Sequence, residues 1–192
     1  MKNIALTAFI DHVANFATVD EEMIEKITLA CTFRSLEKKD QLLKDDQHCQ
    51  HIFFVQKGIL RTFHYQNGKD ITYWVYNEGS VFTSWFSYLN DQPANEYIEA
   101  LEPTQLLLFE KAKFEKILEE CPGFEKFWRK TVEQTLSFLD GFYRGFNFLS
   151  AKEKYDLLIS YYPNATQNIN LGYIASLLGI SQETLSRVRG KR

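Results

Sequence analysis

Near its start the chain carries apolar residues at helical spacing. The first set consists of Leu6, Phe9, Ile10, Val13 and Phe16. Because this set follows the 3.6-residue period, it predicts an amphipathic helix. Met23 and Ile27 continue the helical pattern, and Thr18 with Glu21 fits a capping box at the start of a second helix.

From about Thr32 the apolar period changes to two, as expected for half-buried strands. The alternation predicts strands at residues 32–36, 51–56, 59–65, 71–76, 80–86, 97–101 and 105–109. Asn67-Gly68 separates two of these runs and predicts a tight hairpin, and Lys57-Gly58 marks another turn. A series of short strands like this predicts a sandwich, a barrel or a jelly roll.

Helical spacing returns at Lys111, pauses at residues 121–123 and resumes in the longest predicted helix, from Phe124 to Leu149. Apolar residues in this helix step by three and four, close to a heptad seam. Such a stripe is most often core, but the seam can also meet a symmetry mate while one flank lies on the sheet domain. The dimer contacts predicted along the seam are Trp128, Val132, Thr135, Leu139, Phe142 and Phe146. Ser150 and Glu153 fit a capping box for the next helix.

Two short helices are predicted at the end of the chain. Asn170 can cap the first, Gly179 supplies a sharp turn, Ser181 can cap the second, and Gly190 can close it. Such a pair predicts a helix-turn-helix, whose second helix enters the DNA major groove, and the alternative is a surface helical hairpin. Its polar, DNA-facing positions are Ser181, Gln182, Glu183, Thr184, Ser186, Arg187, Arg189 and Lys191.

Charge favours the DNA-binding interpretation over a plain hairpin. The chain has a net charge of -3, yet from Ser181 onward the cations Arg187, Arg189, Lys191 and Arg192 are opposed only by Glu183. A basic end on an acidic protein is typical of a terminal DNA-binding module.

Composition sets the size and the environment of the protein. With 192 residues, 45% of them hydrophobic, the chain can bury one core plus a small satellite domain. The apolar run from Ile4 to Ile10 is brief and is broken by Asp11, so we expect no secretory signal, no membrane partner and a cytoplasmic location. Three widely spaced cysteines argue against a disulfide framework and against a four-cysteine iron–sulfur cluster within one chain.

Enzyme chemistry has weak support in the sequence. A cupin-type metalloenzyme is one alternative, with His48, Cys49, His51 and His64 as its candidate ligands. We expect His48 and Cys49 to lie in a polar loop and the other two to be ordinary strand residues. Serine-hydrolase, phosphate-loop and metalloprotease motifs are not found. We therefore predict a protein that is not an enzyme, with no catalytic residues, no metal and no cofactor.

The order of the predicted elements resembles the Crp/Fnr family of bacterial transcriptional regulators. The segments that carry this resemblance are FFVQKGILRTF, NGKDITYW, NEGSVF, YIEALEPTQLLLF and IASLLGISQETLSRVRGK. The resemblance implies an α+β fold: an N-terminal antiparallel β jelly roll (double-stranded β-helix) flanked by helices, then a long dimerisation helix and a C-terminal helix-turn-helix domain of winged-helix-like type. The corresponding domains are residues 1–122, 123–149 and 150–192.

The resemblance also implies roles for the last helix. SQETLSR fits the family's recognition helix, so Gln182, Glu183 and Arg187 resemble base-reading positions, whereas Ser181 and Thr184 resemble phosphate contacts. A homodimer would present two such helices, about 34 Å apart, to a pseudo-palindromic site on double-stranded DNA. RNA polymerase and an unidentified small-molecule effector are further partners that the resemblance allows.

The ligand motifs of the family are absent. Members that bind a cyclic nucleotide have a Gly-Glu pair for the ribose and an Arg-Ser pair for the phosphate. This chain reads Phe82-Thr83-Ser84-Trp85 in the first region and Pro93-Ala94-Asn95-Glu96 in the second. Without the arginine, a buried phosphate would lack its partner at a cost of several kcal/mol. We therefore predict no response to cyclic AMP or cyclic GMP. Micromolar binding in a calorimeter would overturn this prediction.

Two interpretations of the pocket remain open. It can be filled by its own aromatic residues, or it can be adapted to another ligand. The residues predicted to line it are Arg61, Trp74, Phe82, Ser84 and Trp85. For Arg61, which alternates with Ile59 and Phe63, we expect a solvent-facing cation rather than a ligand contact.

The link ahead of the C-terminal helices, residues 163–170, leaves little room for the hairpin wing that often accompanies the family's motif. We therefore expect weaker DNA binding than is usual for the family. The alternative function is a small-molecule sensor or protein-binding module with reduced DNA specificity.

Overall fold

The computed structural model describes residues 1–190, apart from the side chains of Phe146 and Asn147. The strands in this range are β1 (Cys31–Leu36), β2 (Gln41–Leu43), β3 (His51–Lys57), β4 (Leu60–Gln66), β5 (Lys69–Tyr76), β6 (Val81–Phe82), β7 (Tyr97–Ala100) and β8 (Thr104–Glu110). The helices are α1 (Lys2–Ala14), α2 (Glu21–Ala30), α3 (Trp85–Asn90), α4 (Lys111–Glu120), α5 (Pro122–Phe148), α6 (Ala151–Tyr161), α7 (Ala165–Asn168), α8 (Leu171–Leu177) and α9 (Gln182–Arg189).

The strands form two four-stranded antiparallel sheets, ordered β1-β8-β3-β6 and β2-β7-β4-β5. Their inner faces enclose a core that includes Phe53, Leu60, Phe82 and Leu106. The predicted α+β fold with an antiparallel roll is confirmed.

Local sequence signals account for most of the turns. The β4–β5 hairpin pairs Gln66 with Lys69, and both Asn67 (φ 52°) and Gly68 (φ 74°) are left-handed, as a two-residue turn requires. Gly58 has a φ of 102°, and a Cβ added there would lie 2.8 Å from the Cα of Thr104. Both predicted turns are therefore confirmed.

Two local predictions are wrong, and one strand was missed. Helix α2 is capped by Asp20, whose carboxylate accepts from the Met23 amide at 2.8 Å, because the helix begins too late for Thr18 to cap it. The strand predicted over residues 80–86 is only β6, and α3 follows it. The short strand β2 was not predicted, because three residues carry too little alternation to be recognised.

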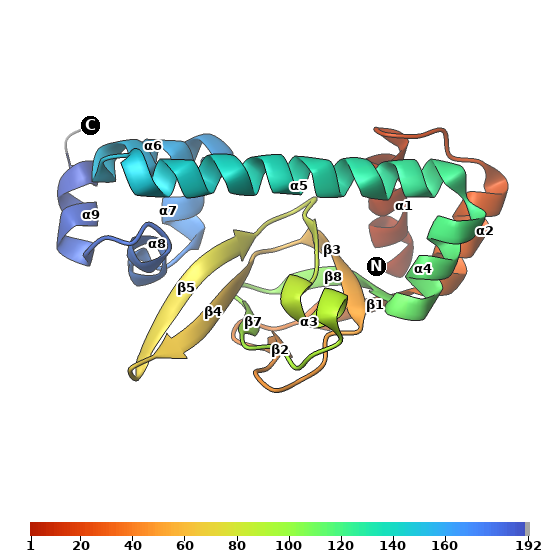
Figure 1. Cartoon of the computed structure of the whole chain (residues 1–192), viewed down its shortest axis with the longest axis horizontal. Coiled ribbons are helices and arrows are strands. Elements are labelled where there is room, and N and C mark those ends of the chain that lie inside the picture. Colours follow the sequence, from red (N-terminus) through yellow and green to blue (C-terminus); the bar gives the residue numbers. More distant parts are fainter. Residues whose placement is uncertain (191–192) are drawn as a thin grey trace.

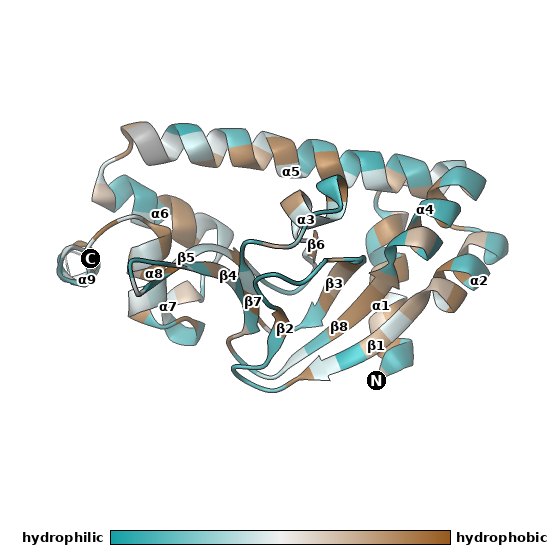
Figure 2. Cartoon of the chain, turned by 60° about the horizontal axis from the view of Figure 1, so that its bottom comes forward, coloured by the Kyte–Doolittle hydropathy of each residue, from teal (hydrophilic) through white to brown (hydrophobic). Residues whose placement is uncertain are grey.

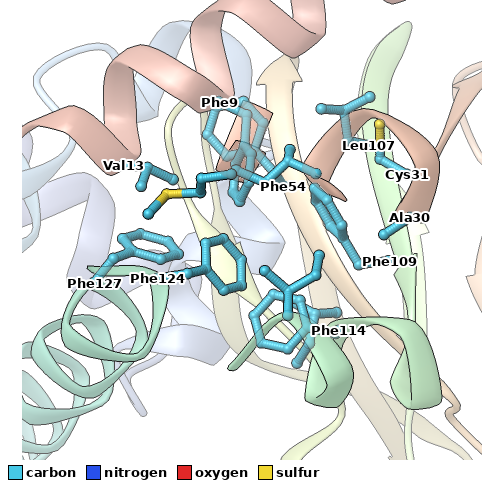
Figure 3. Close-up of a cluster of buried hydrophobic side chains, with 14 of the residues drawn as sticks. Phe9, Val13, Ala30, Cys31, Phe54, Leu107, Phe109, Phe114, Phe124 and Phe127 are labelled. Atoms are coloured by element: carbon cyan, nitrogen blue, oxygen red, sulfur yellow. The ribbon is translucent and has the colours of Figure 1, made fainter. Parts of the chain in front are cut away.

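Helix α5 runs along the molecule, from α1, α2 and α4 at one end to α6–α9 at the other (Figure 1). At the first end its initial turns close an aromatic core (Figure 3), in which the Phe9 ring contacts those of Phe54, Phe109, Phe124 and Phe127. Hydropathy alternates along the rest of α5, while β3 and β8 are mostly hydrophobic (Figure 2). The early turns of α5 are thus anchored by aromatic burial.

A third core joins the roll to the C-terminal helices. It combines Ile59, Val75 and Leu101 of the roll with residues of α6–α9, among them Tyr155 and Ile174. Helix α6 begins with the predicted capping box, in which Ser150 and Glu153 bond each other's backbone amides. None of the described helices is both long enough and apolar enough to cross a lipid bilayer.

Candidate functional site

Helices α8 and α9 form a compact pair, as the sequence predicts. Asn170 caps α8 by accepting from the Gly172 amide at 2.7 Å, and Gly179 turns the chain with a φ of 62°. Ser181 caps α9 by accepting from the Thr184 amide at 3.1 Å. The expected closure by Gly190 occurs with right-handed backbone (φ -73°), so the special freedom of glycine is not used there.

The outer side of α9 is polar and open to solvent. Ser181, Gln182, Glu183, Ser186 and Arg187 are exposed, and Thr184 and Arg189 are half-buried. Lys191 and Arg192 lie outside the described residues. On the opposite side Leu185 is buried in the third core. The helix therefore buries its apolar side and presents amide, carboxylate, hydroxyl and guanidinium groups outward.

Beyond the Ser181 cap, the side chains of Arg187 and Gln182 also lie against neighbouring residues. The Arg187 Nη2 donates to the Thr184 hydroxyl at 3.3 Å, which leaves the rest of the guanidinium outward. The Gln182 amide lies across the start of α8, where its Nε2 would be 2.8 Å from a Cβ added at Gly172. Gly172 thus leaves room for Gln182 between the two helices.

Arg61 ties the C-terminal helices to the roll, so the expectation of a solvent-facing side chain is wrong. Only 2% of Arg61 is exposed. Its guanidinium donates twice to Asp70, both at 2.6 Å, once to Glu99 at 3.0 Å and once to the Thr72 hydroxyl at 2.8 Å. Its Cζ lies 3.7 Å from the ring centroid of Tyr173 in α8. Burial acts to lower the pKa of Arg61, but the two carboxylates outweigh it and raise this pKa.

Two hydrogen bonds to β5 reinforce this attachment. The Ser176 hydroxyl of α8 donates to the Thr72 carbonyl at 3.2 Å. The Tyr162 hydroxyl donates to the Val75 carbonyl at 2.8 Å. The orientation of α8 and α9 is therefore set by the β4–β5 hairpin of the same chain.

A cleft of about 540 Å³ lies beside β5, between the roll and α5. Its aromatic walls are formed by Trp74, Phe82, Trp85, Phe86, Phe138 and Tyr161. Of the five residues predicted for a pocket, Trp74, Phe82 and Trp85 line this cleft. Ser84 is buried, with no hydrogen-bond partner for its hydroxyl among the described residues, and Arg61 lies in the contact with Tyr173. The aromatic residues therefore leave a cleft of ligand size.

Glu96 is the carboxylate of the cleft. It accepts a hydrogen bond from the Tyr73 hydroxyl, and burial raises its pKa to about 7. His12 also lines the cleft, and burial lowers its pKa. No lysine or arginine is found among the described lining residues. Sequence reasoning noticed Glu96 only as a departure from the family motif, because the fold alone brings it opposite α5.

The predicted dimer seam on α5 divides between two sides of the helix. Trp128 stacks on Trp85 at 5.9 Å between centroids, and Phe142 contacts Trp74 at 5.2 Å, so both face the roll of their own chain. Val132 and Thr135 are half-buried, and Leu139 is exposed. The side chain of Phe146 lies outside the described residues. The exposed apolar residues Leu136, Leu139 and Tyr143 form an outward row, and Leu139, the least exposed of the three, also lines the cleft.

The candidate cupin ligands do not converge. Cys49 is buried and its sulfur lies 3.4 Å from the Thr83 hydroxyl, whereas His48 pairs with Asp91 at 3.9 Å. His51 and His64 lie on strands of different sheets. Over residues 1–190, no three side chains of the metal-binding types come together.

Comparisons with known proteins place this fold. Residues 33–121 match the cyclic nucleotide-binding domain family. FixK2 from Bradyrhizobium japonicum superimposes with a TM-score of 0.68 at 18% identity, over 84% of this chain and 83% of that one. The c-di-GMP-responsive global regulator CLP from Xanthomonas campestris superimposes with a TM-score of 0.67 at 10% identity, over 90% of this chain and 91% of that one. A CooA mutant from Carboxydothermus hydrogenoformans superimposes with a TM-score of 0.66 at 20% identity, over 94% of this chain and 82% of that one. No curated protein sequence matches the chain.

Proposed function

We propose that this chain is a sequence-specific, homodimeric transcriptional regulator of Crp/Fnr type that binds double-stranded DNA in the cytoplasm. The match of its roll to the cyclic nucleotide-binding domain family and the likeness of its fold to FixK2, CLP and CooA support this proposal. On this view it is not an enzyme.

One observation carries the proposal: α9 buries Leu185 and exposes Gln182, Glu183 and Arg187. Arginine can bond guanine with two donors, glutamate can accept from cytosine, and glutamine can pair with adenine. Ser181 and Thr184 stand at the start of the helix, where hydroxyls and amides suit a phosphate. The polar side of α9 therefore has the groups that direct base reading requires.

Helix α5 supplies the proposed dimer contact. Its outward row of Leu136, Leu139 and Tyr143 is spaced by three and four residues, as in a two-helix seam. Leu139 also lines the cleft, as does Thr135. A ligand in the cleft would thus touch α5. If the ligand binds two arrangements of the α5 pair with different affinity, it would shift the equilibrium between them and so change the positions of the two α9 helices in the dimer.

Selection of binding sites from random double-stranded DNA tests this function. We expect enrichment of an inverted repeat whose half-sites lie about one helical turn, or 34 Å, apart. Failure to enrich any sequence would favour the alternative, a small-molecule sensor or protein-binding module with reduced DNA specificity. If a site is enriched, transcription from a promoter that carries it would test contact with RNA polymerase.

Cyclic AMP is not the proposed effector. The cleft contains Glu96 in the region where the family's phosphate motif is expected. Its described lining residues include no lysine or arginine, and burial lowers the pKa of His12, which disfavours the charged imidazolium. Titration calorimetry with cyclic AMP and cyclic GMP should show no binding at micromolar concentration.

A further inference from the structure

The cleft beside β5 has an unusual combination of walls and charge. Its walls include tryptophan, phenylalanine and tyrosine rings that are contributed by β5, β6, α3, α5 and α6. Such rings carry negative charge on their faces and attract cations to within about 6 Å. The walls alone would accept any flat apolar molecule.

The polar groups restrict this choice. Thr131 and Thr135 also line the cleft, but their hydroxyls donate to the carbonyls of Phe127 and Thr131 within α5. Glu96 is the only carboxylate among the described lining residues, and the Tyr73 hydroxyl donates to it. This hydrogen bond holds the carboxylate at the wall.

Charge then distinguishes between classes of ligand. An anion would meet the Glu96 carboxylate without any lysine or arginine to pair with, which is unfavourable in a partly desolvated site. An ammonium group can pair with Glu96 while its apolar body lies against the rings. A neutral molecule would gain the apolar contacts alone.

We propose that this cleft is a binding site for a hydrophobic organic cation, an aromatic or aliphatic amine, in which Glu96 receives the ammonium group and Trp74 and Trp85 contact its apolar body. This ligand class differs from the anionic nucleotides that the fold family is named for. A regulatory effect of such a ligand rests on the proposed function, whereas its binding does not.

Three probes with one ring system separate the ligand classes. These are 2-(1-naphthyl)ethylammonium, the neutral 2-(1-naphthyl)ethanol and the anion 1-naphthylacetate, each titrated calorimetrically into the full chain at pH 8 without DNA. We expect the ammonium probe to bind about tenfold more tightly than the alcohol, and the acetate to bind more weakly than either.

Two variants test the role of Glu96. Glu96→Gln keeps the shape and the acceptor for Tyr73, so the ammonium and alcohol affinities should become equal to within about twofold while the alcohol affinity stays unchanged. The control, Glu78→Gln, removes an exposed carboxylate from the neighbouring loop and should keep the wild-type preference. Circular dichroism verifies that both variants fold.

Four results would overturn the proposal. These are that none of the probes binds, that the acetate binds as tightly as the ammonium probe, that the alcohol binds as tightly as the ammonium probe, or that the preference for the ammonium probe over the alcohol persists in Glu96→Gln. Because no DNA is present, these outcomes are independent of the random-site selection. A regulator that binds an inverted repeat but ignores all three probes would keep the proposed function and lose this ligand.

Discussion

At the residue scale, Arg61 shows how burial can contradict strand alternation. Leu60 lies in the roll interior, whereas its neighbours Ile59 and Arg61 lie on the outer side, toward the C-terminal helices. An arginine on an outer side is ordinarily solvated. Here α8 covers that side, and the guanidinium lies between the rings of Phe63 and Tyr173, at 3.9 and 3.7 Å from their centroids.

Arg61→Met should destabilise the protein by about 3 kcal/mol, because it leaves the partly buried Asp70 and Glu99 without their cation. Chemical denaturation monitored by circular dichroism measures this free energy of unfolding. The control is Arg34→Met, which removes an exposed arginine from β1 and should cost much less. Equal losses for both variants would contradict the buried ion pair.

Glu96 makes stability depend on pH. Because burial raises its pKa from 4.5 to about 7, the folded state holds its proton over a range where the unfolded state has released it. Stability from this group is therefore lost as pH rises from about 4.5 through 7. Glu96→Gln should be more stable than wild type at pH 8, by on the order of 1–3 kcal/mol, and this advantage should vanish by pH 4. Denaturant titrations at both pH values test this, and a pH-independent difference would contradict the raised pKa.

Two cations near the C-terminus are expected to act differently on DNA. Arg187→Ala should cost roughly 1 to 3 kcal/mol on the selected site and relax one base position. Lys191→Ala should weaken selected and scrambled DNA alike, since a phosphate contact carries no sequence information. Electrophoretic mobility shifts on both DNAs measure these losses. Equal losses of affinity on selected and scrambled DNA for both variants would contradict a base-reading role for Arg187.

At the element scale, α5 has two different apolar sides. Phe138 and Phe142 pack on Trp74 of the roll, whereas Leu136 is 66% exposed. The heptad seam inferred from the pattern mixed residues from both sides, because a helix that is apolar over a wide angle does not reveal which side meets its own sheet. The long helix itself was correctly predicted, since its length and periodicity are properties of the local sequence.

Leu136→Glu should weaken the proposed dimer, because it places a charge in the outward row of α5. We expect at least a tenfold rise in the dimer dissociation constant, measured by sedimentation equilibrium, since burying an unpaired charge costs more than about 1.4 kcal/mol. Ser137→Glu adds the same charge one position along the helix and should have a smaller effect. If Leu136→Glu dimerises like wild type, the dimer contact does not include the outward row of α5.

At the scale of the whole molecule, the roll and the C-terminal helices share a core. Ile59, Val75 and Leu101 pack with residues of α6–α9, and Tyr173 covers Arg61. The boundaries predicted at residues 122 and 149 remain a prediction. The shared core indicates that the segment after α5 depends on the roll for its stability.

The chain should therefore unfold in a single transition, with circular dichroism and tryptophan fluorescence giving the same midpoint. Tyr173→Leu removes the ring over Arg61 and should lower stability by about 1 kcal/mol and expose α8 and α9 to proteolysis first. Tyr173→Phe keeps the ring and should behave like wild type. Separate transitions in the wild-type protein would show that the two parts are stabilised independently.

Local sequence determined most of the elements of this protein. Periodicity predicted α5 and most strands, and turn and cap chemistry predicted the Asn67-Gly68 hairpin, the Ser150 capping box and the Ser181 cap, because these depend on residues a few positions apart. Only the tertiary structure decided what covers each outer face. The burial of Arg61 by α8 and the placement of Glu96 opposite α5 depend on contacts between distant segments, which no local pattern records.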